Sequence, residues 1–522
     1  MNFLLATIAV IGFLSAGICQ ESDESELRTW FSSTGKFSIA AKMTLSADDK
    51  FNADVLLVKE DGESVTVPYD RLNRESQLFA EAQRKAVRRR VKESLDAEKK
   101  GKLPMVDSDK AEPAASETQD DPAAAATRVW NWRGPNQDGI ADESDLNNDW
   151  RNHPPDLLWS VDGLGSAMSS LAIADGRIYT MGNLDGSEFL FALQLSDGRE
   201  IWKTRVGAGG ESNSTPTVDG DLVFAVGRNG DLICANASDG EKVWSKSFTA
   251  DFGGKMMSQW GYSESPLVDG EQVICTPGGP EAMMVALNKK TGKVIWATPM
   301  LPGGSRGTDG AGYSSPVISN GGGVKQYITL VGRGLISVEA KTGTPLWQYE
   351  KIANGTANVP TPIVDGDFVF CSSGYDDGGT ALLRITGRRG QMSVQEMYYL
   401  SAKELQNHHG GMVKIGQYVY MGEGHNQGFP CCVEMKTGRV LWPKQRGAGT
   451  GSAAIVAADG HLYFRYEDAT MALIEANPQE YRLKGSFKIA SRNGQSWPHP
   501  VIYGGKLFLR DQQQLHCYDL KK

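Results

Sequence analysis

The chain is poor in the features that mark several common protein classes. Its 522 residues include 54 Lys and Arg against 63 Asp and Glu, and the formal net charge of −9 argues against a nucleic-acid partner. Seven cysteines are too few for a dense disulfide scaffold, and most lie in strand-like runs where a free cysteine packs as a small hydrophobe. No phosphate-binding loop, Ser-His-Asp signature or metalloprotease motif occurs, which excludes those enzyme classes.

Amphipathic helices are also missing from most of the chain. After residue 129 the sequence alternates between short β-rich runs and turns. Gly is abundant instead, with 60 residues, and many of them stand in Asp-Gly and Thr-Gly pairs. Because Gly readily takes the positive φ that tight hairpins require, this composition favours an all-β fold with many turns.

A seven-residue phrase occurs five times, always with Gly four residues before Trp. Its copies are SDGREIW, SDGEKVW, KTGKVIW, KTGTPLW and KTGRVLW. Between copies lies a second phrase, a small residue and Pro followed by an apolar run and Asp-Gly, as in TPTVDG (215–220) and SPLVDG (265–270). Each unit then holds four short antiparallel strands in about 40–50 residues, which is typical of one blade of a β-propeller.

The chain contains eight of these four-stranded units, which predicts an eight-bladed β-propeller. Inner strands are expected near Leu171, Thr217, Leu267, Val317, Ile363, Met412, Ile455 and Val501. In the fifth and seventh blades EMYYL (396–400) and YRLKGSF (481–487) replace the Trp phrase as outer strands. The last unit ends without an outer strand of its own, so LLWSV around Trp159 is predicted to complete it. Such closure removes open sheet edges.

The Trp residues of the phrase are expected to pack between neighbouring blades, where one aromatic ring buries roughly 150–250 Å². This set comprises Trp159, Trp202, Trp244, Trp296, Trp347 and Trp442. The pattern favours a structural role over a catalytic one.

The N-terminal part of the chain predicts export and a separate small domain. Residues 1–19 are apolar and end in small residues, as in a secretory signal peptide. A periplasmic or extracellular location follows, with no transmembrane segment in the mature chain. Residues 26–80 show alternating apolar strands and an Asp-Gly hairpin, which predict a small β-barrel.

Two further segments lead to the propeller, which is predicted for 129–522. A short helix with its basic part at 81–100 contains Arg88-Arg89-Arg90. This helix is either a solvated face or a membrane-surface contact. Residues 101–128, rich in Ala, Pro, Asp and Glu, predict a disordered linker.

The 26–80 segment resembles the SLA-one homology domain, an SH3-like barrel. The resemblance rests on Trp30, Gly35-Lys36-Phe37, Lys59-Glu60-Asp61-Gly62 and Val67-Pro68 through Leu72. It implies a peptide-binding adaptor, as in eukaryotic relatives, or a purely structural module.

From Trp130 to the C-terminus the chain resembles the PQQ-like, or quinoprotein-type, β-propeller family. The resemblance rests on WNWRGPNQDG, repeats such as ALNKKTGKVIW, and the segments NHHGG, GHNQGFP and SWPHPV. These segments closely resemble a secreted form of the family that is common in planctomycete bacteria. The family implies an eight-bladed propeller and includes both quinone-dependent alcohol dehydrogenases and non-enzymatic scaffolds such as the BamB-type assembly factor, so fold alone does not choose a function.

Candidate ligand-binding residues lie in the segments that lead into the inner strands, where a propeller forms a funnel. They combine aromatic and hydrogen-bonding groups, which is the general character of a ligand site. The set is Trp260, Tyr262, Glu264, Tyr313, Asn358, His408, His409, Trp497 and His499. The alternative is that these groups only satisfy strand ends and fill the channel.

A quinoprotein dehydrogenase would require PQQ, calcium held by carboxylate and amide oxygens, and an Asp base. Glu264 and Asn358 are weak candidates for the calcium ligands, and Asp309 is a weak candidate for the catalytic base. The vicinal pair Cys431-Cys432 resembles the disulfide that related dehydrogenases place against the quinone. Its register in FPCCVEMKTG instead predicts an ordinary pair on a middle strand, with side chains on opposite sheet faces.

The cluster of His408, His409 and His425 raises a metal site as another possibility. Two adjacent His on an extended segment are expected to point in opposite directions, so at most one of them should face a shared site. No Cys or carboxylate stands at metal-ligand spacing, and no metal is predicted.

The sequence therefore predicts an exported, non-catalytic propeller that acts as a BamB-like binding scaffold with an adaptor-type N-terminal domain. Its expected partners are other envelope proteins or peptides, and no cofactor is expected. Two alternatives remain open. One is a PQQ-dependent alcohol or polyvinyl-alcohol-type dehydrogenase with PQQ and calcium. The other is a propeller that binds carbohydrate or peptide through Trp260 and Trp497.

Overall fold

The computed structural model divides the chain into two compact units, Met1–Thr118 and Gln119–Lys522, and each is described by itself. The described residues are 28–31, 38–44, 55–59, 64–72, 76–77, 80 and 129–521 without 389 and 491–493. The predicted signal peptide (1–19), basic helix (81–100) and all of the linker before residue 129 lie outside them. No helix among the described residues is long and apolar enough to cross a membrane.

The N-terminal unit contains one antiparallel sheet of four strands in sequence order. They are β1 (Arg28–Phe31), β2 (Ser38–Thr44), β3 (Val55–Lys59) and β4 (Ser64–Val67), followed by the short 3-10 helix η1 (Tyr69–Arg71). Leu57 and Leu72 are buried within it. The resemblance to an SLA-one homology domain stays a prediction.

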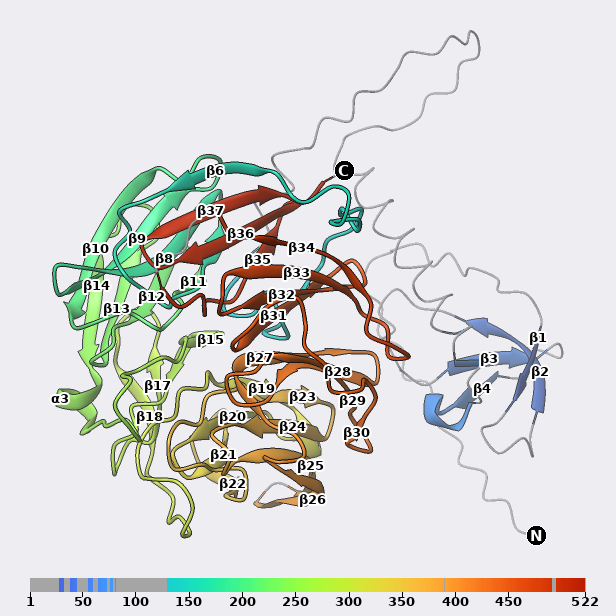
Figure 1. The fold of residues 1–522 in the computed structure, drawn as a ribbon. Helices are drawn as coiled ribbons and strands as arrows, with labels where there is room; N and C mark the ends of the chain where they lie inside the picture. The colour runs from blue at the N-terminus through green and yellow to red at the C-terminus, as the bar shows by residue number, and fades with distance from the viewer. Residues whose placement is uncertain are drawn as a thin grey trace, which may run out of the picture. The chain divides into compact units, whose positions relative to one another are not determined.

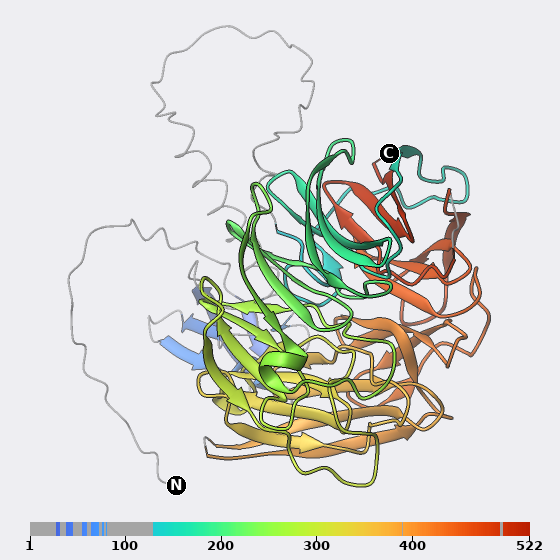
Figure 2. The ribbon, with the colours of Figure 1, turned by 90° about the vertical axis from the view of Figure 1, so that its left-hand side faces the viewer.

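The second unit is an eight-bladed β-propeller, as predicted, and its sheets are seen in two views in Figures 1 and 2. Blade 1 contains β7 (Ala172–Ala174), β8 (Arg177–Leu184), β9 (Ser187–Gln194) and β10 (Glu200–Ala208), and blade 2 contains β11 (Thr217–Asp219), β12 (Leu222–Val226), β13 (Asp231–Asn236) and β14 (Lys242–Ser247). Blade 3 contains β15 (Leu267–Asp269), β16 (Gln272–Cys275), β17 (Met284–Asn288) and β18 (Val294–Thr298). Blade 4 contains β19 (Val317–Ser319), β20 (Gln326–Val331), β21 (Gly334–Glu339) and β22 (Pro345–Tyr349). The short helices α3 (Phe248–Phe252) and η2 (Gly321–Gly323) lie between strands.

Blades 5 to 8 complete the ring. Blade 5 contains β23 (Ile363–Asp365), β24 (Phe368–Ser373), β25 (Gly379–Arg388) and β26 (Gln391–Ser401), and blade 6 contains β27 (Asn407–Ile415), β28 (Tyr418–Glu423), β29 (Phe429–Glu434) and β30 (Arg439–Val440). Blade 7 contains β31 (Ala453–Ala458), β32 (His461–Tyr466), β33 (Thr470–Glu475) and β34 (Leu483–Lys488), with β5 (Ile140–Ala141) added beside β31. Blade 8 contains β35 (Val501–Tyr503), β36 (Lys506–Asp511) and β37 (Gln514–Asp519), with β6 (Leu157–Val161) as its outer strand. All eight predicted inner strands are present at or within a residue of their expected positions.

The predicted closure is confirmed. Strand β6, from the start of the propeller, pairs antiparallel with β37, and Trp159 stands opposite Cys517. Because the first and last parts of the propeller share one blade, the ring of sheets closes without an open outer edge on β37.

The Trp phrase builds contacts between consecutive blades. Trp296 of blade 3 covers Gly343 in the turn of blade 4, where an added Cβ would lie 2.4 Å from Trp296 Cε3. The indole Nε1 of Trp296 donates to the carbonyl of Ala340, 3.2 Å away and three residues before that Gly. Trp202 with Gly240 and Trp244 with Gly292 repeat the arrangement. The Gly of these phrases therefore leaves room for the Trp of the blade before it.

Blade 5 lacks the Trp phrase but keeps this contact. Tyr398 lies against Gly438 of blade 6, 2.9 Å from an added Cβ, and its hydroxyl donates to Met435 O at 2.7 Å. In EMYYL, Tyr398 thus takes the place of the Trp and keeps the contact with the turn Gly of the next blade.

The six described cysteines are all free and buried. Cys431 and Cys432 lie on β29, the third strand of blade 6, and pack into different apolar clusters on its two sides. The prediction of an ordinary strand pair is confirmed.

Candidate functional site

The channel of the propeller is occupied by residues 130–141, the WNWRGPNQDGIA segment that precedes the closing strand. Its contacts span the axis: Trp130 pairs with Ile173 of blade 1, Asn131 bonds to Val218 of blade 2, Gln137 donates to Pro316 O before blade 4, Arg133 donates to Met412 O of blade 6, and Ile140 pairs with Ala457 of blade 7. We call residues 130–141 the channel segment. A single strand of chain can reach five blades only by crossing the middle of the ring.

The channel segment separates two cavities, and Trp132 lines both. The funnel cavity, about 410 Å³, is formed largely by the segments that lead into inner strands. The rear cavity, about 470 Å³, is formed by the inner strands themselves, such as Thr217–Asp219, together with residues 134–138.

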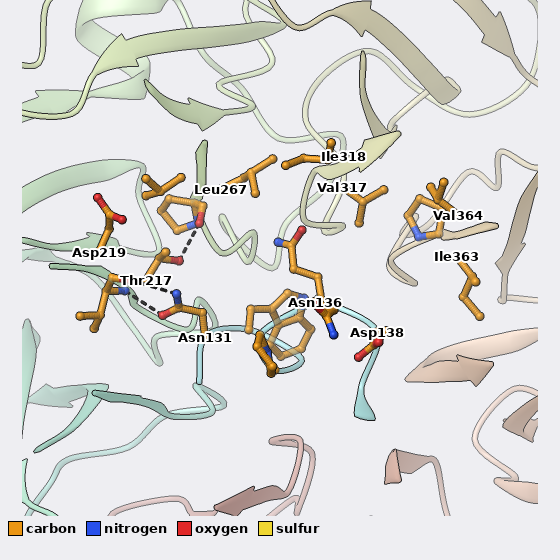
Figure 3. A pocket seen from close by; sticks show the side chains of 18 of the residues that line it. Asn131, Asn136, Asp138, Thr217, Asp219, Leu267, Val317, Ile318, Ile363 and Val364 are labelled. Carbon is orange, nitrogen blue, oxygen red and sulfur yellow. Dashed lines mark hydrogen bonds between the residues drawn. The ribbon is translucent and has the colours of Figure 1, made fainter. Parts of the chain in front are cut away.

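Polar groups of the rear cavity are largely paired with the protein (Figure 3). Asn131 exchanges two hydrogen bonds with the backbone of Val218, at 2.9 and 2.8 Å. Thr217 Oγ1 donates to Pro266 O at 2.6 Å, and Asp219 forms an ion pair with Lys289. No residue that lines the rear cavity, within the described part of the chain, has a buried polar side-chain atom without a partner.

Aromatic rings form a nearly continuous wall around the funnel cavity. Trp260 lies 6.1 Å from Tyr313 and 6.3 Å from Tyr375 between ring centroids. Further ring contacts, each at 4.7 Å, join Tyr375 to His408, His409 to Trp497, and Trp132 to His499. The cavity volume and this apolar wall suit a small ligand.

Six of the nine predicted funnel residues line the funnel cavity: Trp260, Tyr313, His408, His409, Trp497 and His499. Tyr262, Glu264 and Asn358 do not. Tyr262 packs against Phe248 between blades 2 and 3, with its hydroxyl donating to Pro277 O at 2.8 Å.

Glu264 and Asn358, the suggested calcium ligands, are buried outside the cavity with local partners. One carboxylate oxygen of Glu264 accepts the amide N–H of Thr276 at 2.6 Å, and burial raises the pKa of this carboxyl to about 7. The amide oxygen of Asn358 accepts the N–H of Asn354 at 3.0 Å, and its amide nitrogen donates to Val331 O and Gly332 O. The second carboxylate oxygen of Glu264 is buried without a partner among the described residues, and neither residue lines the funnel cavity.

Asp309, the suggested base, is also elsewhere. It forms a 2.7 Å ion pair with Arg333, which lowers the pKa of the carboxyl, and its side chain is 43% exposed. It does not line the funnel cavity. Across the described ranges, no group of three or more His, Cys, Asp or Glu could hold a metal ion.

The prediction that His408 and His409 point in opposite directions is wrong. Both line the funnel cavity, and their rings lie 4.1 Å apart. The cause is an irregularity in β27: the register with β28 is interrupted between Asn407 and Met412, and Gly411 has φ +74°. Alternation of side chains fails where a strand departs from regular pairing.

The three cavity histidines are held neutral by burial. Desolvation is the main cause that lowers the pKa of His408 to about 2 and those of His409 and His499 to about 3. His408 Nδ1 hydrogen-bonds Ser452 Oγ at 2.7 Å. His425 lies behind His408, with ring centroids 4.6 Å apart.

Sequence reasoning missed Trp132, Arg133 and Tyr375. The first two belong to the channel segment, which was noted only as a family motif. Tyr375 comes from the turn between β24 and β25, which returns to the same face as the segments before the inner strands. Arg133 and Tyr375 have φ of 61° and 62°, a left-handed conformation that is costly for residues other than Gly and is found at ligand sites as well as in turns.

Comparison with known proteins gives matches to PQQ-like propellers. Residues 190–444 match the family model described as outer membrane protein assembly factor BamB. The chain is 27% identical over 279 residues to tetrathionate hydrolase of Acidithiobacillus ferrooxidans, covering 51% of this chain and 50% of that protein. It is 30% identical over 228 residues to the assembly factor BamB of Burkholderia pseudomallei, covering 42% and 56%. The chain thus spans about half the length of these curated relatives.

Solved structures with the same fold include BamB and alcohol dehydrogenases. BamB from Moraxella catarrhalis matches with a TM-score of 0.51 at 13% identity, over 70% of this chain and 99% of that one. A europium-containing methanol dehydrogenase matches at 0.54 and 12%, over 73% and 89%. The quinohemoprotein alcohol dehydrogenase from Comamonas testosteroni matches at 0.54 and 12%, over 77% and 82%. The chain has BamB-like repeats and a PQQ-like propeller fold, and the fold is shared by proteins with different functions.

Proposed function

We propose that the protein is an exported, non-catalytic propeller that binds a ligand or an envelope partner in the funnel cavity. The observation that carries the proposal is the convergence of rings and hydrogen-bonding groups from several blades on one cavity at the axis. Trp260, 36% exposed, supplies a ring surface that a partner can reach. The likeness to BamB supports this role because the family model that residues 190–444 match is described as an assembly factor.

The dehydrogenase alternative requires calcium ligands and a base, and the suggested residues do not fit. Calcium takes six to eight oxygen ligands. Glu264 and Asn358 do not line the funnel cavity; one oxygen of each accepts a nearby backbone N–H, and the second oxygen of Glu264 is buried without a partner among the described residues. Asp309 is paired with Arg333 at the surface. The acidic residue lining the funnel cavity is Glu211. We therefore derive no redox step for this chain.

The test is an assay of dye reduction. Purified protein is incubated with PQQ and Ca²⁺, primary alcohols are added, and reduction of an electron-accepting dye is followed. The proposal predicts no rate above the protein-free control. PQQ is a flat polycarboxylate, so binding of PQQ alone does not separate the alternatives, whereas alcohol-dependent turnover contradicts the non-catalytic role.

Binding of carbohydrate or peptide is a second candidate, favoured by the position of Trp260 and Trp497 in the cavity wall. A Trp260→Ala variant that folds should then lose binding of the oligosaccharide or peptide used as probe. Met397→Ala is the matched control, since Met397 is 44% exposed on the outer strand of blade 5. Equal binding by Trp260→Ala and wild type counts against this candidate.

The N-terminal unit is proposed as a second interaction module, joined to the propeller through the linker predicted for 101–128. Export through residues 1–19 is part of the same proposal. Mass spectrometry of protein secreted from a bacterial host should find a mature chain that begins at Gln20.

A further inference from the structure

Five buried side-chain nitrogens in the wall of the funnel cavity have no hydrogen-bond partner among the described residues. Three of them can only donate: Nε and Nη1 of Arg133 and Nε1 of Trp497. The other two are Nε2 of His408 and of His409. Arg133 is only 5% exposed, and Arg133 and Trp497 both line the cavity. Burial without a hydrogen bond costs free energy, and native proteins keep few such groups.

The chemistry of these atoms restricts what can satisfy them. Guanidinium and indole nitrogens are donors only, so they bind acceptors and nothing else. The remaining terminal nitrogen of Arg133, Nη2, donates to the carbonyls of Met412 and Asp138, which fixes the plane of the guanidinium. The remaining donors of Arg133, Nε and Nη1, are thus held in a fixed plane and point from different edges of the guanidinium.

The charge of Arg133 is also unbalanced. Burial lowers its pKa to about 10, so the group remains a cation at neutral pH. Asp138 is near enough to act on it, but its carboxylate accepts the N–H of Ile140, and only its backbone carbonyl bonds Arg133. A buried cation without a hydrogen-bonded carboxylate favours an anionic ligand, because charge-assisted hydrogen bonds offset its desolvation.

The backbone is arranged to hold Arg133 in this position. Arg133 itself has φ 61°. An added Cβ at Gly411 would lie 2.7 Å from Arg133 Nη1 and 2.8 Å from His499 Cε1. Gly411 thereby lets the guanidinium approach the imidazole, and the strained conformation of Arg133 is the kind found at ligand sites.

The rear cavity provides the contrast. It is similar in size and polar, yet no residue that lines it has a buried polar side-chain atom without a partner among the described residues. Size and polarity alone therefore do not distinguish the two cavities. Unpartnered donors and an uncompensated cation occur in the funnel cavity.

We infer that the funnel cavity binds a small organic anion, whose carboxylate or sulfonate group is held by Arg133 and Trp497 and whose flat body packs on the surrounding rings. This inference rests on the proposed function and adds the chemical class of the ligand. The rings of Trp132, Trp260 and Tyr375 provide the apolar wall, and the buried guanidinium of Arg133 offers charged donors to an oxygen of the anionic group.

The test uses isothermal titration of the full chain with three matched probes: naphthalene-2-carboxylate, naphthalene-2-sulfonate and the neutral naphthalene-2-carboxamide. Wild type should bind at least one anion about tenfold or more tightly than the amide, since charge-assisted bonds give the difference. Arg133→Met should bring the anion and the amide to within about threefold.

Trp497→Phe is the second variant, because it keeps a ring in the wall and removes only the donor, so it remains informative if Arg133→Met does not fold. It should also reduce the preference for the anion. Lys414→Met, which removes a cation from the rear cavity, is the matched control and should leave the preference unchanged.

The outcomes separate the inference from the proposed function. Equal affinity of wild type for anions and amide overturns the anionic class while leaving cavity binding in place. An anion preference that survives both Arg133→Met and Trp497→Phe also overturns it. Failure of all three probes overturns the inference, whereas the proposed scaffold role is judged independently by dye reduction and by partner binding of Trp260→Ala.

Discussion

Acid should destabilise the propeller through its buried histidines. His408, His409 and His499 are neutral in the folded protein, since burial lowers their pKa to about 2, 3 and 3. In the unfolded chain a histidine titrates near pH 6.5. Between those pH values the unfolded state binds more protons than the folded state. The free energy of unfolding is therefore unaffected by these histidines above pH 6.5 and decreases as the pH falls below it.

The expected magnitude follows from the pKa difference. At pH 5.0, about 1.5 units below the unfolded value and well above the folded one, each histidine lowers the free energy of unfolding by about 2 kcal/mol. This is a large share of the roughly 5–15 kcal/mol that stabilises a typical domain. Carboxylates add their own dependence on pH, so the measurement must compare variants rather than read one curve.

The assay is urea unfolding at pH 7.5 and 5.0, followed by tryptophan fluorescence, for wild type and His409→Gln. Between the two pH values the variant should lose about 2 kcal/mol less than wild type. His461→Gln is the matched control, because His461 is the first residue of β32, is only partly buried, and bonds the carbonyl of Asp459. An equal loss in His409→Gln and wild type would refute the reasoning.

Two further predictions concern the contacts between blades. Gly343→Ala should cost about 2–4 kcal/mol, because a Cβ there lies 2.4 Å from Trp296 and adds overpacking to the strain of φ +70°. Gly366→Ala, at φ +59° with no atom within 4 Å of the added Cβ, should cost only about 1–2 kcal/mol; equal costs in urea unfolding would contradict the Trp–Gly contact. Tyr398→Phe should lower stability by about 1 kcal/mol through loss of the bond to Met435 O, whereas Tyr398→Ala should cost about 3–5 kcal/mol, and an unchanged melting temperature in both would exclude a role in packing.

The fold was largely predictable because each blade carries its own local signal. Gly and Trp recur at a fixed spacing, and that spacing follows from the contact between the Trp of one blade and the turn Gly of the next. The closing strand was predictable for a different reason: the last unit lacked an outer strand, and LLWSV lacked the inner strands of its own blade. Both inferences depend on the repeat period, which can be read from the sequence without knowing any side-chain contact.

The funnel cavity was only partly predictable because periodicity locates a segment but not the direction of its side chains. Glu264 lies in such a segment, yet its carboxylate turns to the backbone of Thr276. His408 and His409 both reach the cavity because β27 is irregular at that point. Arg133 belongs to a segment outside the repeat, and only the closed ring shows that this segment crosses the channel.

The most direct test of the account is a crystal structure of the protein with 6-bromonaphthalene-2-carboxylate, whose bromine is located by anomalous scattering. The account predicts the carboxylate against Arg133 and Trp497 and the bromine among the rings of the funnel cavity. A ligand found only in the rear cavity, or oriented with its carboxylate away from Arg133, would contradict the claim that the funnel cavity is the binding site for an organic anion.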